Sequence, residues 1–219
     1  MRRRSWLGTG LAALLAPAWG EVRRGQVLAF ARDHGAHPDA RTEWWYATGW
    51  LGSEAAPTHG FQVTFFRSRT GLAEGLESRF AARQLLFAHA AVTQLDGARH
   101  RHDQRIARWS GAPDRGTAVA AVGRGAVRLG PWSLQDEGAA WLARLPGREL
   151  DLQLRLERTQ PLLLQGDAGF SRKGPQPAQA SHYYSQPQMA VLGTLTLDGR
   201  AQPVQGRAWL DHEWSEELL

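Results

Sequence analysis

Alternating hydrophobic and polar side chains are the dominant pattern along the chain. Between Glu149 and Glu157, leucine occupies every second inner position, and charged or amide residues stand between the leucines. Side chains two positions apart lie on one face of a strand, whereas steps of two in a helix turn about 200° and would scatter the leucines around it. The segment Glu149–Glu157 is therefore predicted to be a strand with one buried face.

Three further segments are also predicted to be strands. Gly60–Arg67 alternates between large apolar and polar residues, and Glu43–Leu51 is crowded with aromatic residues, which favour half-buried strand surfaces. Arg79–Ala91 contains good helix formers, but its larger side chains alternate with smaller ones, and this favours a strand.

A hairpin is predicted near the C-terminal end. Asp198-Gly199 stands between the alternating segments Gly193–Leu197 and Val204–Leu210, and this dipeptide is typical of two-residue hairpin turns. The chain shows no long strand–helix–strand alternation, which excludes a doubly wound nucleotide-binding fold. The pattern as a whole predicts an all-β sandwich or barrel.

Segments rich in glycine and proline are predicted to connect the strands. Gly52–His59 and Gly71–Glu77 are expected to be exposed connections. The segment Phe170–Ala180 is longer than a typical connection of about 4–6 residues and holds Lys173, the one lysine of the chain. It is either a lid or mouth of a site, or an irregular turn.

The first twenty residues have the layout of a secretory signal. Basic residues precede an apolar stretch, Trp6–Leu15, which is too short to span a bilayer and is followed by small residues at 16–18. Arg3–Leu7 also fits the twin-arginine pattern, so both export routes remain open. We expect residues 1–20 to be a signal peptide and residues 21–219 to be an exported domain, periplasmic or secreted.

Composition changes this picture only in part. Hydrophobic residues make up 42% of the chain and charged residues 21%, which is typical of a folded globular domain. The formal charge of +5 falls to +2 without residues 1–20, because 23 basic and 21 acidic residues remain. No stretch gathers basic residues into a stripe that would follow a phosphate backbone, so nucleic acid is not an expected partner.

Six sequence blocks occur in a fixed order. They are Thr42–Gly49, Gly60–Arg67, Leu86–Thr93, Gly169–Gly174, Ser181–Ser185 and Trp209–Trp214. In this order they resemble the carotenoid 1,2-hydratase-like (AttH-like) proteins, often labelled predicted secreted hydrolases, over about Val27–Glu216. The resemblance implies a lipocalin-like, calycin-type antiparallel β-barrel. Because relatives continue through a second such domain, residues 21–219 are expected to be the first domain of a pair.

The resemblance also implies a site. Hydratases of the family add water to an isolated terminal double bond of an acyclic carotenoid, and their His-x-aromatic and aromatic-x-Asp pattern falls on His182, Tyr184, Trp209 and Asp211. A carboxyl group in an apolar cavity can stay protonated, so Asp211 is expected to protonate the alkene. The faces of Trp209 and Tyr184 would stabilise the cation, and His182 would orient or deprotonate the water. This chemistry requires no cofactor.

The expected ligand is a long apolar molecule, an isoprenoid or a lipid, which implies action close to a membrane. The candidate ligand-binding residues are Trp44, Trp45, Tyr46, Phe65, His89 and Tyr183. For the tryptophans the alternative is packing within the barrel, and for His89 it is a hydrogen-bonded place in the core. Glu43 is either a buried acid or, more in keeping with its residue type, a solvated residue at a strand start.

Three classes of function remain open at this point: a hydratase, a non-catalytic lipid or pigment carrier, and an accessory module that lacks its second domain. A metal is not expected, because Asp211, His212 and Glu213 alternate between strand faces and His100 and His102 lack a third ligand. A serine hydrolase is not expected either, because the chain has no Gly-x-Ser-x-Gly motif.

Overall fold

The computed structural model describes residues 22–112, 116–176 and 178–217, so the predicted signal peptide, residues 1–20, lies outside the described residues. Regular structure in the described part is almost entirely β, which confirms the predicted all-β fold. The strands are β1 (Thr42–Ser53), β2 (Ala56–Arg69), β3 (Gln84–Gln94), β4 (Arg99–Trp109), β5 (Ala118–Ala120), β6 (Ala126–Leu129), β7 (Trp132–Asp136), β8 (Ala140–Leu145), β9 (Leu150–Glu157), β10 (Leu163–Leu164), β11 (Phe170–Arg172), β12 (Ala180–Leu197) and β13 (Arg200–Ser215). Two 3-10 turns are η1 (Arg32–His34) and η2 (Asp96–Ala98).

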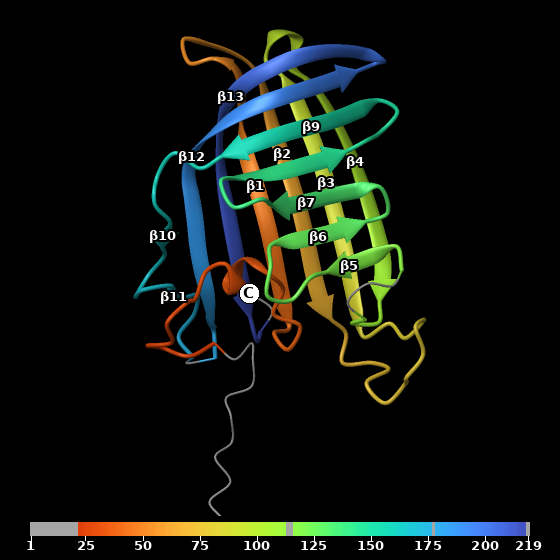
Figure 1. Cartoon of the computed structure of the whole chain (residues 1–219), viewed down its shortest axis with the longest axis vertical. Helices are drawn as coiled ribbons and strands as arrows, with labels where there is room; N and C mark the ends of the chain where they lie inside the picture. Colours follow the sequence, from red (N-terminus) through yellow and green to blue (C-terminus); the bar gives the residue numbers. More distant parts are fainter. Residues whose placement is uncertain (1–21, 113–115, 177, 218–219) are drawn as a thin grey trace, which may run out of the picture.

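These strands form one antiparallel sheet that curls into a nearly closed barrel (Figure 1). Its order is β4-β3-β2-β1-β13-β12-β9-β8-β7-β6-β5, and β10 and β11 pair with the first part of β12. Long strands β1–β4 form one wall, and the shorter strands β5–β9 cross in front of them (Figure 1). The register between β12 and β13 shifts at Gln186–Met189. After this irregularity β12 pairs with β9, whereas the part of β12 before it pairs with the end of β13, which in turn pairs with β1.

The strands with the clearest alternation are confirmed. The predicted strand Glu149–Glu157 is β9, whose four leucines are all buried against the core. The predicted strand Arg79–Ala91 begins later than expected, at Gln84, and is β3. The predicted hairpin joins β12 to β13 through Asp198 and Gly199, whose φ angles are +50° and +76°. Two consecutive positive φ angles are what a two-residue hairpin turn of this twist requires.

Two predicted connections differ from the structure. The sequence predicts an exposed connection over Gly52–His59, but β1 runs to Ser53 and β2 begins at Ala56. The reason is a β-bulge at Leu51 and Gly52, where Gly52 has a φ of +124° and a Cβ would lie 2.7 Å from a backbone oxygen. Within Phe170–Ala180, the first three residues pair with β12 as β11, so the irregular part is shorter than predicted.

Large side chains fill the inside of the barrel. Trp45, Trp132 and Trp141 are each at most 1% exposed and belong to one cluster with the leucines of β9. Burial of this apolar surface is the main stabilising contribution to the fold. The interior at these tryptophans is therefore packed core. Within the described residues, no helix is long and apolar enough to cross a membrane.

Candidate functional site

The first halves of β1 and β12 and the last part of β13 lie side by side, and this part of the sheet has two faces with different chemistry. Cross-strand register aligns Tyr46, Asp211 and Ser185 in one row and Trp45, His212 and Tyr184 in the next. The second row is buried inside the barrel, whereas Tyr46 and Asp211 are half-buried on the outside. Because neighbouring residues of a strand point to opposite faces, the chain builds two separate clusters here.

The sequence-predicted catalytic residues are divided between these faces. Trp209 and Asp211 share the outer face, and His182 and Tyr184 lie fully buried on the inner face. The structure thus does not bring Asp211 and His182 into one cavity. Their sequence spacing left this open, because it does not determine the register between β12 and β13.

Asp211 is the centre of the outer cluster. Its Oδ1 accepts hydrogen bonds from Trp209 Nε1 at 2.7 Å and from Ser185 Oγ at 2.5 Å. Burial, together with the charge of Asp211, raises the pKa of Tyr183 to about 12, so the phenol is protonated at neutral pH and is a donor beside the carboxylate. These contacts combine a carboxylate with three aromatic neighbours, since Tyr46 is the register partner of Asp211 on β1.

A second acid lies two residues further along the same face. Glu213 Oε1 is 2.7 Å from Lys173 Nζ and accepts a hydrogen bond from Ser181 Oγ at 2.5 Å. The Lys173 ammonium also lies 4.7 Å from the ring centroid of Tyr183, a cation–π contact. The one lysine of the chain therefore ties the segment after β11 to the outer cluster.

An aromatic strip adjoins this cluster on its β1 side. We define the outer aromatic strip as Trp44, Phe66 and Phe87, which are register partners on β1, β2 and β3. Successive ring centroids are 6.0 Å apart, and all three side chains are half-buried. His89 is exposed on the same side of β3, three strand spacings from Asp211, or about 14 Å. His89 is thus neither a core histidine nor a direct neighbour of the carboxylate.

The inner face carries an ion network that the sequence did not reveal. Glu43 is fully buried, and its carboxylate accepts hydrogen bonds from Arg67 Nε at 2.9 Å, from His212 Nε2 at 2.9 Å and from His37 Nδ1 at 2.8 Å. The interpretation of Glu43 as a solvated residue was wrong, because the segment 22–41 covers this end of the barrel. His212 Nδ1 lies 3.1 Å from the Tyr184 hydroxyl, so the predicted catalytic Tyr184 is part of this buried network.

The charges of the network shift several pKa values. Burial alone would raise the pKa of Glu43, but Arg67, His37 and His212 outweigh it and hold that pKa well below its ordinary value. Burial alone would lower the pKa of His37, but Glu43 and Asp33 raise it. Desolvation by burial lowers the pKa of His212, which is therefore neutral at pH 7.

Comparison with known proteins places this geometry in a family. The family profile described as AttH-like matches residues 21–219. The chain belongs to the AttH-like family. A solved structure from Nitrosomonas europaea, of a protein assigned as an AttH, is 41% identical, has a TM-score of 0.77, and aligns with 90% of this chain and 58% of its own.

A second solved structure shows the same fold at low identity. Kievitone hydratase from Nectria haematococca aligns with a TM-score of 0.61 and 10% identity, covering 92% of this chain and 56% of its own. This AttH-like chain thus spans a little more than half the length of both proteins, and the comparison supports the predicted lipocalin-like barrel. No curated protein matches the sequence.

In this AttH-like chain, His37, Glu43 and His212 offer three metal-ligand atoms within 4.8 Å of one another. Histidine and carboxylate ligands suit zinc, but the contacts of these residues do not fit a metal. Arg67 donates to the same carboxylate, and the second ring nitrogen of His37 faces Asp33 at 3.5 Å. The donor atoms are engaged in hydrogen bonds and ion pairs.

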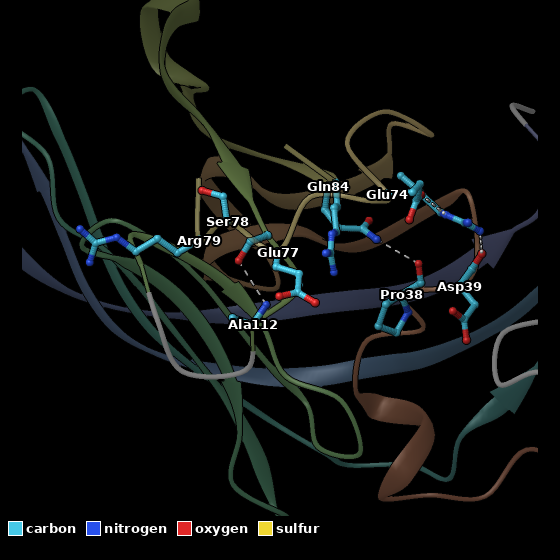
Figure 2. A pocket seen from close by; sticks show the side chains of 12 residues that line it. Pro38, Asp39, Glu74, Glu77, Ser78, Arg79, Gln84 and Ala112 are labelled. Carbon is cyan, nitrogen blue, oxygen red and sulfur yellow. Dashed lines mark hydrogen bonds and ion pairs between the residues drawn. The ribbon is translucent and has the colours of Figure 1, made fainter. Parts of the chain in front are cut away.

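A pocket of about 550 Å³, lined mainly by charged and polar residues, opens at the same end of the barrel (Figure 2). Its lining includes Arg69, Glu77 and Gln84, and Gln84 also accepts a hydrogen bond from Arg67 Nη1 at 2.6 Å. None of the ten sequence-predicted site residues belongs to this lining. Charged walls of this kind do not suit a long apolar ligand.

The other predicted ligand-binding residues divide in the same way. Trp44, Tyr46 and Tyr183 lie on the outer face with Asp211, while Trp45 and Phe65 are packed in the core. Sequence reasoning missed Arg67, whose partner Glu43 is 24 residues away, and His37, which is close to its partners Glu43 and Asp33 in the sequence but was not singled out. The one signal was a charged residue within each of two apolar strands, Glu43 in β1 and Arg67 in β2.

Proposed function

We propose that this AttH-like protein binds a long apolar small molecule, of isoprenoid or lipid type, on its outer face and adds water to an isolated double bond of that molecule at Asp211. The observation that carries the proposal is the convergence of Asp211, Trp209 and Tyr183 beside the outer aromatic strip. The half-buried rings supply apolar contact area, and the carboxylate supplies a group for proton transfer.

The chemistry divides into two balanced steps. The reactive form of Asp211 is the carboxyl group, formed when the carboxylate takes up a proton from water. This proton moves to the terminal carbon of the alkene, which leaves a carbocation that the faces of Trp209 and Tyr46 stabilise. Water then attacks the cation and returns a proton to the carboxylate, so that one water molecule is added and the enzyme is regenerated. Hydrogen bonds from Trp209 and Ser185 to Oδ1 orient the carboxyl group, and we assign proton delivery to Oδ2.

Two comparisons support this proposal without transferring an activity. The family profile links the chain to AttH-like proteins, and one protein that shares its fold is a hydratase by name. The layout of residues 1–20 supports export, and we include a periplasmic or secreted location in the proposal. N-terminal sequencing of the exported protein is expected to begin near Glu21, and a mature protein that still carries Met1 would contradict export.

The experiment uses Asp211→Asn, which keeps the size of the side chain and an oxygen that accepts from Trp209. The full chain is incubated with a terminal-isoprene substrate in isotopically labelled water, and binding is followed by quenching of tryptophan fluorescence. We expect the variant to lose label incorporation at least about a hundredfold while its affinity stays within about twofold. Asp151→Asn, at an acid on β9, is the matched control and is expected to retain the wild-type rate.

Three outcomes would decide between the classes of function. Incorporation at the wild-type rate in Asp211→Asn would remove the proposed role of this acid. Saturable binding without incorporation in the wild type would favour the carrier, and no saturable quenching by polyenes or fatty acids would reject the outer face as an apolar ligand site.

A further inference from the structure

The connection between β2 and β3 is a long loop that is held in place at its base. Thr70 N donates to the carbonyl of Arg83 at 3.0 Å, and the Thr70 hydroxyl donates to the carbonyl of Ala82 at 2.7 Å. Arg83 Nη2 also donates to the carbonyl of Leu76, which ties the tip of the loop back to its base. In Figure 1 this loop (gold) projects beyond the ends of the strands, at the end of the barrel opposite the β12–β13 turn.

The loop displays large apolar side chains to solvent. Leu72, Leu76 and Phe80 are 69%, 56% and 59% exposed. Exposure of such apolar surface to water is unfavourable in free energy, and the hydrogen bonds at the base of the loop nevertheless hold it in this position. The three side chains follow one another at intervals of four residues, so they recur along the same segment instead of being scattered over the barrel.

Two arginines flank the ring of Phe80. The guanidinium groups of Arg79 and of Arg108 on β4 lie 4.7 and 5.6 Å from the centroid of the Phe80 ring. The acids of the loop have arginines beside them: Glu74 is 3.1 Å from Arg69, and Glu77 lines the pocket together with Arg79 (Figure 2). The loop therefore combines exposed apolar side chains with a surplus of positive charge, since Arg69, Arg79, Arg83 and Arg108 outnumber Asp39, Glu74 and Glu77 around it.

We propose that the β2–β3 loop docks the protein on an anionic lipid bilayer, with Leu72, Leu76 and Phe80 inserted among the lipids and Arg79 and Arg108 against the headgroups. Exposed apolar side chains flanked by cationic groups are the combination that binds the interface of negatively charged membranes. The charge distribution favours lipid over a second copy of this chain, because two such loops would bring their arginines together. The inference does not depend on the proposed hydratase chemistry.

The test exploits the absence of cysteine from the chain. Leu76→Cys in the full chain is labelled with an environment-sensitive fluorophore and mixed with vesicles of phosphatidylglycerol and phosphatidylcholine. We expect a blue shift of the probe and quenching by lipids brominated in the acyl chains, both reduced by high salt. The control is the same label at Leu192→Cys on β12, which is 48% exposed and lies away from the loop; we expect no shift there.

Loss-of-binding variants complete the test. Phe80→Ser is expected to weaken vesicle binding at least about tenfold, and Arg79→Gln with Arg108→Gln to abolish the preference for anionic vesicles. Equal probe shifts at both labelled positions, no shift at Leu76→Cys, or equal binding to vesicles of phosphatidylcholine alone would overturn the proposal. A shift that grows with protein concentration in the absence of vesicles would overturn it in favour of self-association.

Discussion

Replacement of Glu43 by Gln tests whether the buried ion network holds the covered end of the barrel together. The Glu43 carboxylate accepts hydrogen bonds from Arg67, His37 and His212, and both Glu43 and Arg67 are 0% exposed. The glutamine amide would offer one acceptor oxygen where three side-chain donors converge, and its NH₂ group would bring further donors to the same place. The positive charge of Arg67 would remain buried without its counter-ion.

Removal of one partner from a buried ion pair costs about 3–5 kcal/mol, because an uncompensated charge stays in a low-dielectric environment. This is a large share of a typical domain stability of about 5–15 kcal/mol. Urea unfolding, followed by far-ultraviolet circular dichroism, is expected to show a midpoint lowered by more than about 1 M at an unchanged slope.

A matched control separates burial from pairing in this prediction. Arg69 and Glu74 form an ion pair with 43% and 46% exposed side chains, and Glu74→Gln is expected to change the free energy of unfolding by less than about 1 kcal/mol. A free energy of unfolding for Glu43→Gln within about 1 kcal/mol of the wild type would refute the reasoning, since the network would then be dispensable.

Three further results are expected. Burial, followed by the charge of Arg158, lowers the pKa of His34 to about 3, so the stability that neutral His34 contributes is complete above its ordinary pKa of about 6.5 and is lost as the pH falls from there toward 3. The variant His34→Gln should therefore show a smaller change of the urea midpoint between pH 7 and pH 4 than the wild type does. Asp211→Asn should lower the pKa of Tyr183 from about 12, as measured by a phenolate absorbance titration with Tyr183→Phe as the reference, and an unchanged value would show that burial alone causes the shift. Leu154→Ala, at a core position, should cost about 2–5 kcal/mol in urea unfolding, and an effect as small as that of an exposed leucine would contradict the assigned inner face of β9.

In this protein the proposed chemistry lies on the outer face of β1, β12 and β13, and not inside the barrel. A lipocalin-like barrel implies a ligand inside, but Trp45 and Phe65 are packed against other core side chains here. Asp211 and Trp209 lie outside, in contact with each other. The proposed site is therefore a surface beside the barrel, and a second domain or a lipid surface could cover it without entering the core.

The sequence by itself determined several of the strands and the face that each of these strands buries. The leucines of β9 and the Asp198-Gly199 turn are local signals: the two-residue period decides the buried face, and positive φ angles decide the turn, with no help from distant residues. The shared face of Trp209 and Asp211 is also a local signal, because it depends only on their spacing of two residues along one strand.

Only the tertiary structure decided which faces meet. Residues His182 and Asp211 lie on neighbouring strands, and the register between these strands, which no short-range pattern encodes, sets them on opposite sides of the sheet. The burial of Glu43 likewise depends on Arg67, 24 residues away, and on His212, 169 residues away. A charge can lie in the core only where such distant partners neutralise it, so its place became evident only when the barrel had brought them together.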